Sequence, residues 1–157
     1  MTAAIDIAVD CPKWTKAIPD VERRCRRAAE AALAAPIESS AGTGSVAVLL
    51  ASDAALRALN RRFRGFDKPT NVLSFPAGEG DSLGDLALAY DTAATEARAD
   101  GIALADHLAH LVVHGVLHLR GLDHQRAADA EAMEAVEIEL LARLGIADPY
   151  RPRDASP

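Results

Sequence analysis

The chain has 157 residues, half of them hydrophobic and a quarter charged, which predicts one compact soluble domain over residues 1–150 and a flexible tail over 151–157. It contains no apolar stretch of the roughly 18 residues that a membrane span needs, and no signal or transit peptide pattern, so we expect a cytoplasmic protein. The formal net charge of −6 disfavours a generic nucleic-acid binder, although the basic segments 13–27 and 52–70 permit a local basic groove.

The first half of the chain alternates strand and helix patterns. Residues 4–9 alternate apolar and polar side chains, as a half-buried strand does. Residues 19–35 read as a helix, and the β-branched apolar run 45–51 reads as a second strand. A second helix is predicted over 54–63, with a Ser-Asp pair at 52–53 as its N-cap.

The second half adds two strands and three helices. The strands 71–75 and 83–90 are joined by a short polar turn and form a hairpin-like pair. The helices are predicted at 91–100, 102–119 and 129–144. This order predicts an α+β fold, in which a four-stranded mixed sheet is covered by helices and the apolar helix 102–119 is central.

All five histidines lie between His107 and His124, which marks this segment as the candidate site. The sequence HGVLHLRGLDH places His114 and His118 four residues apart, on one face of a helix. Gly121 can take the left-handed conformation that ends a helix, so that His124 returns toward the same point. Three neutral imidazoles then hold a divalent ion and leave one coordination position for water.

The donor set also indicates the ion and the reaction class. Zinc suits an all-nitrogen tetrahedral site with an open position, and nickel or another late divalent ion also fits. Such an ion brings the pKa of bound water near neutrality, which indicates a hydrolase. Metzincin peptidases share this histidine spacing but carry a glutamate directly after the first histidine. Here Gly115 occupies that position, so a peptidase would lack its general base.

Three neighbours of the triad each keep two interpretations. His107 and His110 share the helix face of the ligand pair, and serve either packing or contact with a substrate. Asp123, next to His124, either orients a metal ligand or makes an ordinary turn or cap contact.

Two further segments complete a resemblance to a known family. Residues 59–76 read LNRRFRGFDKPTNVLSFP, and residues 83–86 read LGDL. Together with HGVLHLRGLDH they resemble the YbeY family. These are bacterial single-strand-specific endoribonucleases linked to maturation of the 3′ end of 16S ribosomal RNA and to ribosome quality control. The resemblance covers most of the chain, with the motifs in the same order.

The resemblance implies that His114, His118 and His124 bind the metal and that Arg64 matches the functional arginine of the family. A guanidinium suits this role because its planar fork addresses two phosphoryl oxygens at once. Without the family, Arg64 reads as a solvated charge at a helix end. We also predict a groove for RNA whose contacts are sequence-independent and salt-sensitive. Its basic wall comprises Arg57, Arg61, Arg62, Arg64 and Lys68.

Two other functions stay open from the sequence. The chain is alternatively a ribosome-assembly binding factor in which zinc stabilises the fold, or a small metallohydrolase of another anionic substrate. Gly115 disfavours peptides, and the arginine-rich segment 57–64 favours an anionic substrate. The family resemblance also implies partners on the small ribosomal subunit, including a ribosomal protein and the assembly GTPase Era.

Overall fold

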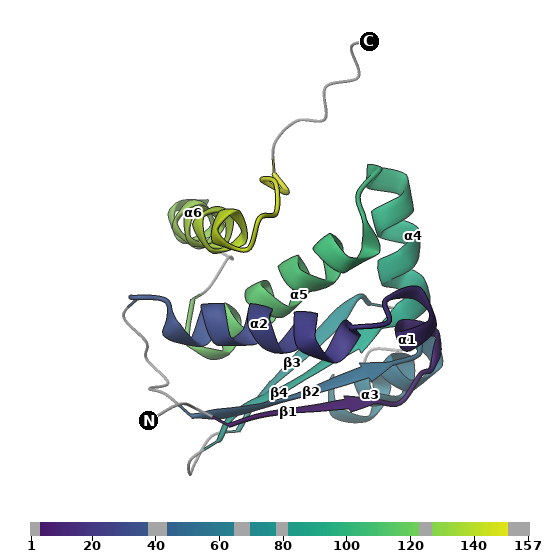
Figure 1. Ribbon diagram of the computed structural model, residues 1–157. Coiled ribbons are helices and arrows are strands. Elements are labelled where there is room, and N and C mark those ends of the chain that lie inside the picture. Colours follow the sequence, from purple (N-terminus) through teal and green to yellow (C-terminus); the bar gives the residue numbers. More distant parts are fainter. Residues whose placement is uncertain (1–3, 38–43, 65–69, 78–81, 123–126, 151–157) are drawn as a thin grey trace.

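The structure of the chain, a computed structural model, describes residues 4–37, 44–64, 70–77, 82–122 and 127–150. Within these residues a single sheet of four strands is packed among six helices (Figure 1). In chain order the elements are β1 (Ile5–Val9), α1 (Lys13–Ala17), α2 (Val21–Ala34), β2 (Ser45–Ala51), α3 (Asp53–Arg64), β3 (Val72–Pro76), β4 (Ser82–Ala89), α4 (Tyr90–Asp100), α5 (Leu104–Leu119) and α6 (Ala127–Arg143).

The sheet has the strand order β1-β2-β4-β3. β1, β2 and β4 run parallel, whereas β3 is antiparallel to β4 and forms one edge. Parallel neighbours need a crossover connection, and α2 supplies it between β1 and β2. The observed sheet confirms the predicted α+β fold, and each strand lies within one residue of its predicted bounds.

The five predicted helices also form, each within two residues of its expected bounds. The sequence pattern does not predict α1, because a five-residue helix is too short for an apolar period to show. Trp14 anchors α1: its ring is fully buried, and its Nε1 donates to the carbonyl oxygen of Ala51 at 3.0 Å. The Ser52 hydroxyl accepts from the backbone of Ala55, which confirms the predicted N-cap of α3.

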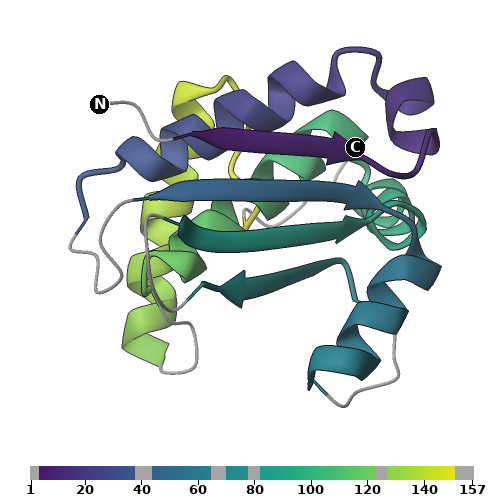
Figure 2. The ribbon, with the colours of Figure 1, turned by 90° about the horizontal axis from the view of Figure 1, so that it is seen from below.

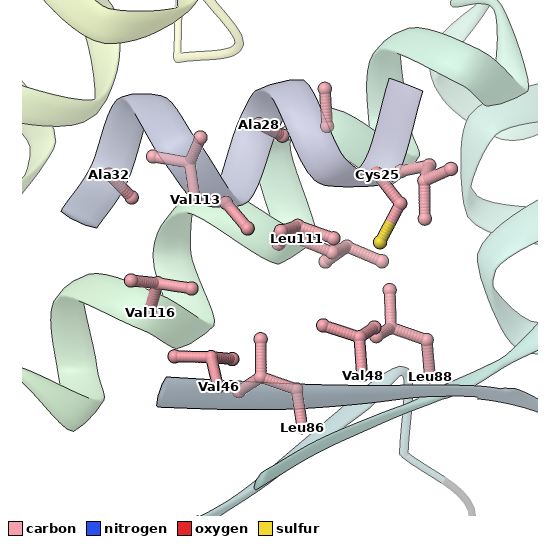
Figure 3. Packing of buried hydrophobic residues seen from close by; sticks show 14 of the residues in the cluster. Cys25, Ala28, Ala32, Val46, Val48, Leu86, Leu88, Leu111, Val113 and Val116 are labelled. Carbon is pink, nitrogen blue, oxygen red and sulfur yellow. The ribbon is translucent and has the colours of Figure 1, made fainter. Parts of the chain in front are cut away.

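Helices α2 and α5 pack on one face of the sheet, whereas α3 packs against one end of the opposite face (Figures 1 and 2). Because side chains alternate along a strand, Val46 and Val48 of β2 and Leu86 and Leu88 of β4 point to the same face. Figure 3 shows these four side chains directed at α2 and α5, with which they form the main core. On the opposite face Leu56 of α3 belongs to a second, smaller apolar cluster.

α5 is the most buried helix of the described residues. A Cβ added at Gly115 would lie only 2.7 Å from Cδ2 of Leu86, so the helix approaches β4 more closely there than a side chain allows. A glutamate at this position, as in metzincins, therefore has no room. No single helix in the described ranges is long and apolar enough to cross a membrane, and α4 and α5 reach that length together only across a 115° bend.

Arg120, which follows α5, ties this helix to α2. Its side chain is buried, and its Nη1 donates to the carbonyl oxygens of Ala32 and Ala35, each at 2.8 Å. These carbonyls lie at the C-terminal end of α2, where a helix has no internal partner for them. Burial lowers the pKa of Arg120, while the two acceptors offset part of the cost of desolvation. The guanidinium thus caps one helix from the end of another.

Gly84 allows the end of α5 to lie directly on the hairpin. Its φ is +150°, and an added Cβ would lie 2.5 Å from the carbonyl oxygen of Phe75 and 2.8 Å from Cδ2 of Leu119. The pairing of β2 with β4 shifts by one residue at this point, since Ser82 and Gly84 pair with consecutive residues of β2. The family-like LGDL segment is therefore a bulge with a close backbone contact.

We expect Gly84→Ala to lower the free energy of unfolding by about 3 kcal/mol, because the new Cβ must displace the backbone of β3. Gly145→Ala is the matched control. Gly145 also has a positive φ, +80°, but nothing lies within 4 Å of an added Cβ, so we expect a loss of about 1 kcal/mol. Urea unfolding followed by circular dichroism measures both values, and equal losses would contradict the steric explanation.

Candidate metal centre

Four histidines form a stripe along α5. His107, His110, His114 and His118 are three or four residues apart, and this spacing places them on one face of the helix. The ring centroids of the first three are separated by 6.3 and 6.4 Å. Side-chain exposure rises from 10% at His107 through 16% at His110 to 28% at His114. Exposure therefore increases along the stripe from His107 to His114, the first of the predicted metal ligands.

A buried carboxylate on α6 contacts two of these histidines. Glu137 has no exposed side-chain surface, and its Oε2 lies 2.8 Å from Nδ1 of His114. Its Oε1 lies 2.8 Å from Nε2 of His110 and also accepts a hydrogen bond from the hydroxyl group of Tyr150. The Glu137 carboxylate thus connects α5, α6 and the segment that follows α6.

The sequence reasoning missed Glu137, although the sequence carries a signal for it. α6 contains many acidic residues, and most of them are surface charges. Glu137 differs because it follows Met133 by four residues and precedes Leu140 and Leu141 by three and four. Met133, Leu140 and Leu141 form the buried apolar stripe of α6. A single carboxylate in the apolar stripe of a helix indicates a buried partner, and here the partners are histidines.

The hydrogen bonds keep the Glu137 carboxyl group ionised. Burial alone would raise its pKa, but the hydrogen bonds from His110, His114 and Tyr150 outweigh burial and lower the pKa to about 2. An ionised carboxylate only accepts hydrogen bonds, so the ring nitrogens that face it must donate. Burial and the neighbouring carboxylate also raise the pKa of Tyr150, which keeps its hydroxyl proton available for Glu137.

His107 belongs to a second hydrogen-bonded group. Its Nε2 lies 2.9 Å from Oε1 of Glu96 on α4, and the side-chain amide of Asn71 donates to the same oxygen at 2.9 Å. This group joins α4, α5 and the start of β3. His107, His110 and His114 also line a cavity of about 420 Å³ together with Asn71 and Glu96. His107 and His110 therefore have both a packing role and access to a cavity beside the predicted ligands.

The donor groups near the end of α5 fit a divalent metal ion. His114 donates from Nδ1 to a carboxylate, which is the usual outer contact of a metal-binding histidine and leaves the lone pair on Nε2. His118 lies one turn further along α5. The described residues contain no group of three metal-binding side chains, and His124 and Asp123 lie outside them. The ligand set therefore stays a prediction.

The turn that was predicted after His118 is present. Gly121 has a φ of +102° and its N–H bonds to the carbonyl oxygen of His118 at 3.0 Å. The N–H of Leu122 bonds to the carbonyl oxygen of Leu117 at 3.1 Å, which completes a Schellman motif. The chain thus leaves the helix axis directly after the second predicted ligand, as the approach of His124 requires.

The structure does not bring the described arginines together with the histidines. Arg57, Arg61 and Arg62 are exposed on α3, which packs against one end of the sheet face opposite to α5 (Figures 1 and 2). Arg64 is the last residue of α3; its side chain and all of Lys68 lie outside the described part of the structure. A groove that used both groups would have to pass around the edge of the sheet at β3.

Comparisons with known proteins identify relatives over nearly the whole chain. The family model described as Endoribonuclease YbeY matches residues 9–145. A protein named Endoribonuclease YbeY from Paramagnetospirillum magneticum is 50% identical, over 96% of this chain and 98% of its own length. A protein of the same name from Bradyrhizobium sp. strain BTAi1 is 47% identical, over 98% and 94%. The solution structure of TM1509 from Thermotoga maritima has a TM-score of 0.56 at 25% identity, over 94% of this chain and 99% of that one.

We expect Glu137→Gln to lower the free energy of unfolding at neutral pH by about 3 kcal/mol, because a neutral amide replaces a charge-assisted acceptor. The pKa of Glu137 is lowered from 4.5 to about 2, so the stabilisation is complete above pH 4.5 and disappears as the pH falls toward 2. Urea unfolding of both proteins at steps through this range measures the difference. A difference that stays constant down to pH 2 would contradict the role of the ionised carboxylate.

Proposed function

The chain belongs to the YbeY family of endoribonucleases, and on this basis we propose that it is a zinc-dependent nuclease of ribosomal RNA maturation. We further propose that it cuts single-stranded precursor RNA near the 3′ end of 16S ribosomal RNA. The observation that carries the metal-dependent activity is the contact of His114 Nδ1 with the buried Glu137 carboxylate, one turn before His118. This contact is typical of a histidine prepared to bind a metal.

The ion would be held by His114, His118 and His124. When bound, it would supply a polarised water molecule at neutral pH and a positive charge for the phosphoryl oxygens. We propose zinc because three imidazoles with one open position suit its tetrahedral geometry. Nickel or another late divalent ion is the alternative, and a metal analysis would detect it. Gly115 lies against Leu86, so no side chain beside His114 serves as a base from that position.

The chain's own residues would bind and orient the RNA. Arg64 would place its guanidinium against the scissile phosphate, where a planar fork holds two oxygens. The other cations of the predicted wall, Arg57, Arg61, Arg62 and Lys68, would hold the phosphate backbone without reading its sequence. Since the described arginines and the histidines lie on opposite faces of the sheet, the strand of RNA would cross the edge at β3.

The cavity beside the histidines restricts this path. It is lined by Asn71 and Val72, at the start of β3, and by His114. Its wall includes the carboxylates of Glu96 and Asp100, which repel phosphate. The backbone of a bound RNA is therefore expected to stay with the cations of α3 until it reaches the end of the histidine stripe.

The place of action follows from the proposed substrate. A nuclease of precursor ribosomal RNA works in the cytoplasm, and its partners would be proteins of the small ribosomal subunit and an Era-type assembly GTPase. The acidic residues of segment 79–106 have the right sign for contact with basic ribosomal proteins. Co-purification with small subunits from a cell extract would test this association.

We expect His114→Ala and Arg64→Ala each to reduce cleavage of single-stranded RNA at least about 100-fold, because the first removes a predicted ligand of the metal ion and the second removes the guanidinium charge at the phosphoryl group. Arg27→Ala is the matched control, since Arg27 is exposed on α2 and is not part of the predicted groove. Single-turnover cleavage of a labelled RNA measures the rates, and circular dichroism verifies the folds. Wild-type rates in both folded variants would disprove the proposed mechanism.

We expect purified protein to contain about one zinc ion per chain and to lose RNA cleavage on chelation. Zinc added after removal of the chelator should restore the activity. Metal analysis, a cleavage assay and thermal unfolding before and after chelation distinguish the proposals. A fall in melting temperature without any metal-dependent cleavage would instead support the assembly factor with a structural zinc.

A further inference from the structure

We propose that Glu137 is a positioning residue of the metal centre: it holds the ring proton of His114 on Nδ1 and so directs the Nε2 lone pair to the ion. This inference rests on the proposed function, because it takes His114 as a metal ligand. Glu137 would not be a ligand itself, since each of its carboxylate oxygens already accepts a hydrogen bond from a histidine ring.

The proton count supports this assignment. A neutral imidazole has one N–H donor and one nitrogen with a lone pair, and either nitrogen can carry the proton. His114 Nδ1 lies 2.8 Å from Oε2 of Glu137, an oxygen that only accepts hydrogen bonds when the carboxyl group is ionised. A proton on Nδ1 satisfies this 2.8 Å contact and leaves the lone pair on Nε2. The adjacent negative charge also makes the ring a stronger electron donor toward a cation.

The other carboxylate oxygen fixes the direction of this contact. Oε1 accepts hydrogen bonds from Nε2 of His110 and from the hydroxyl group of Tyr150. With Oε1 held by two donors from different segments, the plane of the carboxylate cannot turn, and Oε2 stays aimed at His114. This gives His110 a role that the sequence left open, because it orients Glu137 without contacting a metal.

Packing of α6 on α5 does not by itself explain a carboxylate at this position. Transfer of a carboxylate into a fully buried site costs several kcal/mol, and apolar residues of similar volume usually pack two helices at least as stably. Met133, Leu140 and Leu141 already supply apolar contact from the same helix. The charge is therefore explained by what it does to the histidines.

The decisive test compares Glu137→Gln with Glu139→Gln, an exposed carboxylate on the same helix whose partner is Arg143. Zinc affinity is measured by competition with a chromophoric chelator, at a temperature where circular dichroism shows every protein folded. We expect Glu137→Gln to weaken zinc binding about 10- to 100-fold and Glu139→Gln to leave it unchanged. Because the glutamine amide fills the same volume, the loss would reflect the missing charge and acceptor.

A second readout reports on the ring itself. Nitrogen-15 NMR of the metal-free protein distinguishes the two tautomers, and we expect His114 to be protonated on Nδ1 in the wild type and to lose this preference in Glu137→Gln. A merely structural role would lower the melting temperature but leave zinc affinity and tautomer unchanged, and that result would overturn the proposal.

Glu137→Asp keeps the test valid if the glutamine variant does not fold. The shorter side chain retains the charge but cannot hold both 2.8 Å contacts without movement of α6, so we expect weaker zinc binding. Wild-type affinity in the folded aspartate variant would overturn the positioning role. A wild-type protein that binds neither zinc nor another divalent ion would instead disprove the proposed metal site, and this inference with it.

Discussion

The burial of the Glu137 carboxylate constrains the whole C-terminal half of the structure. A carboxylate without exposed surface is stable only where hydrogen-bond donors replace water. Here the donors come from His110 and His114 on α5 and from Tyr150 beyond α6. They satisfy the carboxylate in one relative position of the two helices, and this position also brings Met133 of α6 into the main core. A polar contact thus sets the register of an apolar interface.

α5 extends this constraint to the rest of the fold. Its middle lies on Leu86 because Gly115 has no side chain, and its end lies on the hairpin because Gly84 has none. Directly after the helix, Arg120 bonds to the last carbonyl groups of α2. The histidines are therefore carried by a helix that the sheet, α2 and α6 all hold in place. A rigid support of this kind is what a preorganised site requires.

The sequence predicted the fold more completely than the site. The spacing of apolar residues predicts the strands and the long helices, because every second side chain of a strand and every third or fourth of a helix must face a core. The short helix α1 has no such pattern and depends on one anchor, Trp14. The histidine pair and the turn at Gly121 could be predicted because their geometry is local. For Glu137 the sequence shows only a carboxylate in an apolar helix stripe, and its partner does not follow from this pattern because the contact joins residues 23 positions apart. The separation of Arg57 from the histidines depends on sheet topology, which local patterns do not contain.

The separation of the arginines from the histidines also determines how these two parts of the proposed site would act on one RNA strand. Arg64 ends α3 on one face of the sheet, while Asn71 lines the cavity that reaches His114 on the other. Only six chain steps separate Arg64 from Thr70, so their Cα atoms lie at most about 20 Å apart, whatever path the connection takes. The end of α3 is therefore tethered to the start of β3, the edge strand next to the cavity. An RNA strand needs to cross only this one edge to meet both a guanidinium and the histidine stripe, and no movement of the sheet is required.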